Sequence, residues 1–101
     1  MTLKLYNNNE ILLFLGERIK QLRLSKNMTQ SALAEKIGLN RVTISEIENG
    51  APTSLLSLIE IMRALGIVDN LNNIIPLPQK SPYELLKEEK KKRKRAKNKS
   101  S

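Results

Sequence analysis

Short amphipathic segments, each closed by a helix-breaking residue after a few turns, are the feature that most restricts the fold of this 101-residue chain. Between residues 11 and 66 the apolar residues recur at steps of three and four, the spacing that lines one face of a helix. Four such segments follow one another. The sequence therefore predicts an all-α fold of short helices around one core.

The first predicted helix runs from Ile11 to about Ser25. Its apolar face consists of Leu12, Leu15, Ile19 and Leu22. Gly16, inside this helix, costs it about 1 kcal/mol relative to alanine. Before the helix, the apolar residues from Leu3 to Tyr6 alternate weakly like a strand, but a lone strand of that length is not stable without a partner.

The second and third predicted helices are short and meet at Gly38, which permits the left-handed conformation that a tight turn needs. Thr29 and Asn40 stand where the N-caps of these helices belong. The third helix ends at Asn49-Gly50. The side chains expected to face inward are Leu33, Ala34, Ile37, Leu39, Ile44 and Ile47.

The fourth predicted helix follows a cap at Thr53 or Ser54 and closes at Gly66. Its apolar stripe consists of Leu55, Leu58, Ile59, Met62 and Leu65. A short fifth helix is expected around Asp69–Asn73. These two helices complete the set that the apolar spacing predicts before the proline-containing segment begins.

Positive charge is concentrated at the C-terminal end. The chain carries 18 Lys and Arg against 10 Asp and Glu, a net charge of +8. Residues 87–101 hold nine of those cations and two glutamates, a net charge of +7, which leaves +1 for residues 1–86. The SPYE sequence at 81–84 predicts one or two helical turns from Pro82 to about Glu89. The basic tail beyond is expected to be disordered unless a polyanion or an acidic partner neutralises it.

The composition argues against several classes of function. Because the chain has no cysteine and no histidine, it lacks thiolate nucleophiles, Cys-rich zinc sites, the commonest metal ligand and the commonest general base. No Gly-rich phosphate loop is present. The longest apolar run, Ile11 to Leu15, is far shorter than the roughly 18 residues that a bilayer span requires. We expect a soluble, cytoplasmic, nucleoid-associated protein without enzymatic activity, cofactor or metal.

Residues 30–48, QSALAEKIGLNRVTISEIE, carry the most specific signal. With Gly38 at the corner, this pattern resembles the Xre/Cro-type helix-turn-helix, the fold of lambdoid phage repressors. The resemblance extends from about Leu15 to Leu71 and includes the segments LGERIKQLR and IENG. It implies a five-helix, lambda-repressor-like domain over residues 11–76. Residues 1–10 then form an N-terminal extension, and residues 77–101 form a Pro-containing linker, a short helix and the basic tail.

Helical geometry independently selects the side chains of the third helix that can reach DNA. At about 100° per residue, burial of Ile44 and Ile47 turns the opposite side of the helix outward. In the helix-turn-helix mode, the N-terminal part of this helix enters the major groove. The base-reading candidates are Asn40, Arg41, Val42 and Glu46, with Thr43 and Ser45 secondary. Glu46 has two interpretations, because it either accepts a hydrogen bond from a cytosine amine or pairs with a nearby lysine.

The resemblance also implies roles for residues outside the third helix. It places Gln30 and Asn49 on the phosphate backbone, and it pairs Arg23 with Glu48, with Arg23 also touching phosphate. It further implies a homodimer, because a two-fold dimer reads two DNA half-sites about one helical turn apart. The residues after the fourth helix that either complete the core or form the dimer interface are Leu71, Ile74 and Ile75.

The cationic side chains of the tail have three explanations: contact with DNA phosphates, contact with an acidic protein, or simple solvation. We favour the contact with DNA, which would add affinity without sequence preference. The residues concerned are Lys90, Lys91, Lys92, Arg93, Lys94, Arg95 and Lys97.

The segment LGIVDNLNNIIPLPQKSPYELLKEEKKKRKRAKNKS, residues 65–100, resembles the C-terminal region of HipB-like antitoxins, which are associated with HipA-type kinases. This resemblance implies a homodimeric repressor that binds the operator of its own operon. It also implies a complex with a HipA-type kinase toxin, in some systems with a third small subunit. The alternatives are a stand-alone regulator of phage or restriction-modification type and a protein-interaction adaptor with the same fold.

Overall fold

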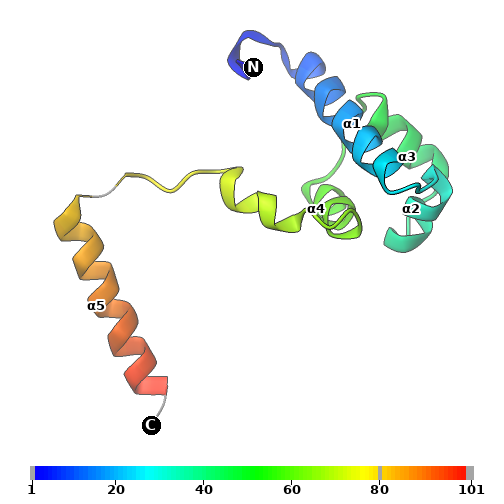
Figure 1. Ribbon diagram of the computed structural model, residues 1–101. Helices are drawn as coiled ribbons and strands as arrows, with labels where there is room; N and C mark the ends of the chain where they lie inside the picture. The colour runs from blue at the N-terminus through cyan, green and yellow to red at the C-terminus, as the bar shows by residue number, and fades with distance from the viewer. Residues whose placement is uncertain (1, 80, 100–101) are drawn as a thin grey trace. The chain divides into compact units, whose positions relative to one another are not determined.

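The computed structural model describes residues 2–79 and 81–99, with the side chains of 94–99 outside the description. Its elements are all helical within these ranges, which confirms the predicted all-α class (Figure 1). In chain order they are η1 (Leu3–Leu5), α1 (Asn8–Ser25), α2 (Gln30–Ile37), α3 (Arg41–Glu48), α4 (Leu55–Ala64), η2 (Val68–Asn73) and α5 (Pro82–Lys99). The chain divides after Asn70 into an N-terminal and a C-terminal unit.

Helix α1 begins at Asn8, three residues before the predicted start, because Asn7 and Glu10 form a capping box. The backbone N–H of Asn7 donates to the Glu10 carboxylate at 3.0 Å, and the Glu10 N–H donates to the Asn7 side chain at 2.8 Å. These two bonds satisfy donors that a helix N-terminus otherwise leaves unpaired. The strand-like interpretation of Leu3 to Tyr6 is wrong, since Leu3–Leu5 forms a 3-10 turn.

The predicted boundaries of α2 and α3 are confirmed. The Thr29 and Asn40 side chains accept hydrogen bonds from Ala32 N–H and Thr43 N–H, at 3.0 and 2.8 Å. Gly38 ends α2 with a φ of 72°, a left-handed conformation that suits glycine. This turn sets the angle between the two helices.

Helix α4 is capped by Ser54, one of the two predicted residues, whose hydroxyl accepts from Ser57 N–H at 3.0 Å. The inward face of α4 differs from the predicted stripe. Ile61 is fully buried although it is not part of that stripe, whereas the predicted Leu55 is 65% exposed. The short fifth helix is present as the 3-10 element η2.

One hydrophobic core holds the N-terminal unit together. Its buried members are Ile19, Leu33, Ala34, Ile44, Ile47, Ile61 and Leu65. Ile37 and Leu39 pack against this cluster and are partly buried. Of the residues predicted to face inward around the α2–α3 turn, Leu33, Ala34, Ile44 and Ile47 are therefore confirmed as core.

At Gly16, α1 lies very close to the backbone at the C-terminal end of α3. A Cβ atom at this position would meet the carbonyl oxygen of Ile47 and would lie 2.7 Å from that of Glu48. Real Cβ atoms do not approach backbone oxygens so closely, so only glycine lets the two helices touch here. The helix-propensity cost assigned to Gly16 from sequence is offset by this packing.

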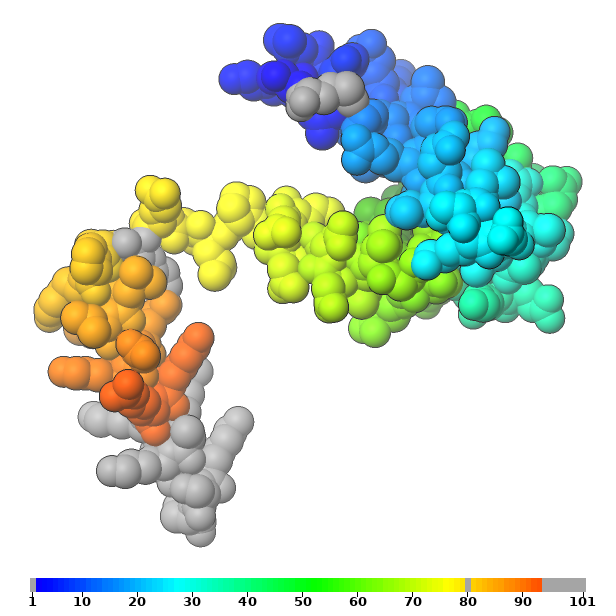
Figure 2. All heavy atoms as spheres, viewed as in Figure 1, coloured from blue at the N-terminus to red at the C-terminus, as the bar shows by residue number. Residues whose placement is uncertain are grey.

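The C-terminal unit has few buried side chains. Leu71 is partly buried, and the described side chains from Asn72 onward are exposed. Helix α5 extends to Lys99, ten residues beyond the predicted end near Glu89, and the Ser81 hydroxyl accepts from Glu84 N–H at 3.3 Å. Figure 2 shows the side chains of residues 82–93 projecting from this helix.

Candidate nucleic-acid interface

Helix α3 has one face in the core and one face in solvent. Ile44 and Ile47 are 1% and 5% exposed, whereas Val42 is 54% exposed and Arg41 and Glu46 are also exposed. This is the division that the helical period predicts. The three outward side chains are cationic, apolar and anionic, so together they can recognise different base edges.

The base-reading candidate Asn40 and the secondary candidates Thr43 and Ser45 are partly engaged in local structure. Asn40 uses its carboxamide oxygen to cap the helix, accepting from Thr43 N–H at 2.8 Å and from the Thr43 hydroxyl at 2.9 Å. Its NH2 group is the end left to donate to a base. Thr43 and Ser45 are half-buried. The exposed positions of α3 are Arg41, Val42 and Glu46.

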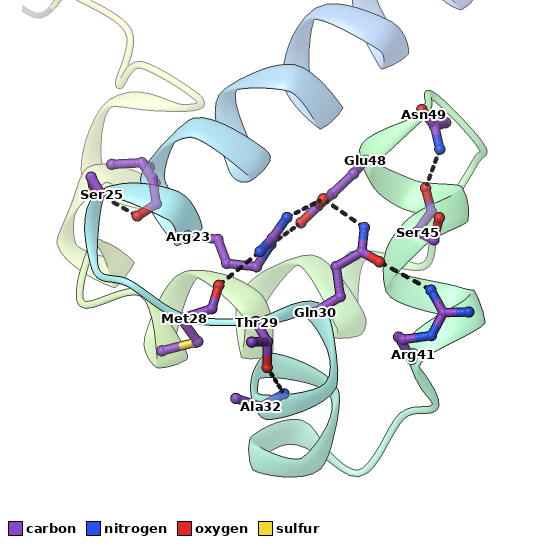
Figure 3. Close-up of polar contacts among 11 residues, drawn as sticks. Arg23, Ser25, Met28, Thr29, Gln30, Ala32, Arg41, Ser45, Glu48 and Asn49 are labelled. Atoms are coloured by element: carbon purple, nitrogen blue, oxygen red, sulfur yellow. Dashed lines mark hydrogen bonds and ion pairs between the residues drawn. The ribbon is translucent and has the colours of Figure 1, made fainter.

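A buried ion pair ties α1 to the end of α3. Arg23 Nε and Nη2 donate to the two carboxylate oxygens of Glu48 at 2.7 and 3.0 Å, and Arg23 Nη1 donates to the Met28 carbonyl at 2.7 Å (Figure 3). Arg23 and Glu48 are 5% and 3% exposed. Hydrogen bonding to Glu48 raises the pKa of the Arg23 guanidinium above its ordinary value, against the opposing effect of desolvation.

This geometry confirms the predicted Arg23–Glu48 pair. The phosphate contact expected of Arg23 stays a prediction. Its guanidinium is enclosed and donates to groups inside the protein. Arg23 fixes the position of Glu48 through these contacts.

Gln30 links this pair to the outward face of α3, a connection that the sequence did not predict. Its amide nitrogen donates to Glu48 Oε1 at 3.0 Å, and its amide oxygen accepts from Arg41 Nη1 at 3.3 Å (Figure 3). Gln30 and Arg41 are each the first residue of their helices. Nothing in the spacing of 11 residues indicates that these two side chains meet, because the contact depends on the angle at the α2–α3 turn.

Asn49 closes α3 at the opposite end. Its side-chain amide donates to the Ser45 carbonyl at 2.9 Å, and its backbone N–H donates to the carbonyls of Ser45 and Glu46, both at 3.1 Å. The residue is exposed. The phosphate contact expected of Asn49 stays a prediction.

The predicted dimer and tail residues lie in the C-terminal unit. Ile74 and Ile75 are 55% and 80% exposed, so the interpretation that they complete the core is wrong for both. Lys90, Lys91, Lys92 and Arg93 are exposed along α5, and a 3.8 Å ion pair joins Arg93 to Glu89. The side chains of Lys94, Arg95 and Lys97 lie outside the described residues.

Other kinds of site find no support in the parts of the chain that the structure describes. No group of three or more His, Cys, Asp or Glu side chains is arranged there to hold a metal ion. None of the described helices is both long enough and apolar enough to cross a membrane.

Comparison with known proteins agrees with this geometry. Residues 19–69, half of the chain, match the helix-turn-helix family. The control protein C.BamHI of Bacillus amyloliquefaciens is 46% identical over 61 residues, which cover 58% of this chain and 75% of the relative. The residues matched by the family contain the α2–α3 turn and the exposed face of α3. The chain belongs to the helix-turn-helix family of DNA-binding regulators.

Proposed function

We propose that the protein is a non-enzymatic, sequence-specific transcription regulator that reads DNA by placing α3 in the major groove. The observation that carries this proposal is the two-sided character of α3. Its inner side is fixed in the core by Ile44 and Ile47, while Arg41, Val42 and Glu46 stand outward. A helix held rigidly on one side can present the other side to base edges in a constant register.

Each outward residue has a chemistry suited to a different base. The Arg41 guanidinium can donate two hydrogen bonds to guanine, and Val42 can pack on a thymine methyl group. Glu46 can accept from a cytosine amine, and among the described residues its carboxylate has no ion-pair partner to divert it. Asn40 contributes a further base contact, and Thr43 and Ser45 contribute secondary contacts. Asn49 and the exposed amides at the start of α2 meet phosphates.

Replacing Arg41 with alanine tests this mode of recognition directly. The preferred site is first selected from a pool of DNA duplexes with a randomised centre, and every base pair of that site is then varied. We expect the variant to lose discrimination at one base-pair position by about 5- to 150-fold, equivalent to about 1–3 kcal/mol. Arg63→Ala, which removes an exposed arginine from α4, is the matched control for lost charge. Equal losses at all positions would contradict base reading by Arg41.

Dimerisation through Leu71, Ile74 and Ile75 is part of the proposal, because one α3 helix contacts only a few base pairs. Ile74 and Ile75 are large apolar residues that stand in solvent in the single chain. We expect the double variant Ile74→Asp/Ile75→Asp to weaken dimerisation at least tenfold, or by about 1.4 kcal/mol, in sedimentation experiments. Leu5→Asp, at an 81% exposed position elsewhere, is the control. An unchanged dimer constant would exclude this interface.

The basic segment adds affinity that does not depend on sequence. Each phosphate that it neutralises contributes about −0.9 to the slope of log affinity against log salt concentration. Removal of residues 87–101 should therefore weaken binding to all duplexes to a similar extent and flatten the salt dependence. The ratio between preferred and scrambled DNA should stay the same. A salt slope unchanged by the deletion would show that the segment does not contact DNA.

The relative supports one class of regulator over the other. Similarity to a control protein favours the stand-alone regulator of phage or restriction-modification type over the HipB-like antitoxin. The HipB-like interpretation depends on residues 65–100, and the comparisons give no support to a HipA-type kinase partner. Repression would follow from occupation of the promoter. Co-purification of the product of the adjacent gene separates the two classes, because only the antitoxin requires a stable complex with a kinase.

A further inference from the structure

We propose that α5 binds DNA as a helix with a fixed orientation, in which one half of its surface faces the phosphates and the other half faces away. This inference rests on the proposed contact between the basic segment and DNA, and it adds the residues and the orientation of that contact. It concerns the described side chains of α5, residues 82–93, all of which are exposed.

Charge is distributed unevenly around α5. At about 100° per residue, the described side chains separate into two arcs of roughly 160° each. The first arc, which we call the cationic half, carries four cations and no carboxylate, and its members are Tyr83, Leu86, Lys87, Lys90, Lys91 and Arg93. The second arc, the acidic half, carries three carboxylates and one cation, and its members are Pro82, Glu84, Leu85, Glu88, Glu89 and Lys92.

An ion pair and a cation–π contact involve the cationic half, and both leave its positive charge in place. Arg93 lies 3.8 Å from Glu89, but the two side chains are 80% and 63% exposed, and ion pairs in such positions are weak. The Lys87 ammonium lies 5.6 Å from the centroid of the Tyr83 ring. An aromatic ring attracts a cation without neutralising it. The charge of this half thus remains available to an anionic partner.

Like charges are also neighbours within the cationic half. Lys87 and Lys90 are three residues apart, and so are Lys90 and Arg93. Side chains at this spacing lie next to each other on a helix, and like charges there repel and destabilise it. A partner that places negative charges along the helix would relieve this repulsion. The pattern therefore favours a partner with repeated anionic groups.

A DNA backbone fits the cationic half better than a protein surface does. Three of the four cations are lysines, which are strongly hydrated and are depleted from the centres of protein interfaces. A duplex instead presents rows of phosphates, and their neutralisation by Lys and Arg releases counterions. The three glutamates of the acidic half would be repelled by the same phosphates. Only one orientation of α5 therefore brings it against DNA.

Two adjacent leucines distinguish this oriented helix from an extended polycation. Leu85 and Leu86 are 54% and 59% exposed, so both can be replaced without disturbing a core. On the helix, Leu86 lies in the cationic half and Leu85 lies in the acidic half. An extended segment without a fixed orientation would bring both positions to the phosphates equally. The two positions are therefore matched in residue type and exposure and differ in the half to which they belong.

The test compares Leu86→Lys with its control Leu85→Lys in the full chain, since each variant adds one positive charge. Fluorescence anisotropy on scrambled DNA over a series of salt concentrations gives the slope of log affinity against log salt. We expect Leu86→Lys to steepen this slope by about 0.9, the effect of one additional phosphate contact, and Leu85→Lys to leave it unchanged. Equal steepening by both variants would show that the segment binds without a fixed orientation and would overturn the proposal.

Lys90→Gln tests the same surface by loss of a charge, because Lys90 lies within the cationic half. We expect this variant to flatten the salt slope by about 0.9. A slope unchanged by Lys90→Gln and by both leucine variants would overturn the proposal and favour an acidic protein as the partner of α5.

Failure of this inference and failure of the proposed DNA contact give different results. If removal of residues 87–101 leaves the salt slope unchanged, the basic segment does not contact DNA, and the proposed role of that segment fails. If the removal flattens the slope but the two leucine variants behave alike, the segment contacts DNA and the fixed orientation of α5 is wrong.

Discussion

Replacing Glu48 with alanine is expected to lower the free energy of unfolding by about 3–5 kcal/mol. The reason is the charge left behind. Arg23 is 5% exposed and directs two of its N–H groups at Glu48, so the variant would bury a guanidinium without a counter-charge. The Gln30 amide would also lose its acceptor. Urea denaturation followed by circular dichroism measures the change.

A variant that removes both charges separates this cause from simple loss of packing. Arg23→Met combined with Glu48→Leu replaces the pair with apolar side chains of similar length. Because no buried charge remains, we expect the double variant to be clearly more stable than Glu48→Ala. If the free energy of unfolding of Glu48→Ala lies within about 1 kcal/mol of the wild-type value, then the ion pair does not stabilise the fold in the way that the geometry indicates.

Gly16→Ala is expected to destabilise the protein by about 1–3 kcal/mol, the usual cost of overfilling a packed contact. Helix propensity alone predicts the opposite sign, a gain of about 1 kcal/mol. The added methyl group would meet the carbonyl oxygens of Ile47 and Glu48, which are backbone atoms and cannot rotate away. Helix α1 would have to move away from the end of α3. The midpoint and slope of urea denaturation give the free energy of unfolding of the variant and of the wild type.

Lys20→Ala is the control for this prediction, because Lys20 is an exposed residue of the same helix. Its replacement should change the free energy of unfolding by no more than about 0.5 kcal/mol. A stabilised Gly16→Ala variant would mean that α1 and α3 do not approach each other closely at this point. Movement of α1 away from the end of α3 would also disturb Glu48. The changes in the free energy of unfolding caused by Gly16→Ala and by Glu48→Ala should therefore not be additive.

The helices that carry the site could be predicted from local sequence. Thr29, Gly38 and Asn40 act on residues close to them in the chain, as caps or as a turn, so their effect does not depend on the rest of the fold. The burial of Ile44 and Ile47 also follows from periodicity alone. Because a helix turns by about 100° per residue, the burial of those two residues sets the outward direction of α3.

The remaining features depend on contacts between segments distant in sequence. The close approach at Gly16 requires the end of α3, which is far away along the chain. The complete burial of Ile61 depends on which side of α4 meets the core, and the apolar residues of that helix fit more than one register. The bridge from Glu48 through Gln30 to Arg41 depends on the angle between two helices. None of these three features can be predicted from the spacing of residues in the sequence.

The capping box before α1 is a local feature that the sequence does contain. Asn7 and Glu10 have the spacing of an N-cap residue and its reciprocal partner. The three consecutive asparagines, Asn7 to Asn9, indicate a break equally well. Asparagine favours both caps and turns for the same reason, since its short side chain competes for backbone hydrogen bonds. Only Glu10, three residues after Asn7, distinguishes a helix cap from a turn at this place.

The most direct test of sequence-specific DNA reading is binding of the full chain to DNA from its own promoter, compared with scrambled DNA of the same length. Fluorescence anisotropy at two salt concentrations gives the affinities needed. We predict tighter binding to the promoter at both salt concentrations, because base contacts by α3 add to the salt-sensitive phosphate contacts. Weak binding that is equal on the two duplexes and lost at higher salt would contradict the account.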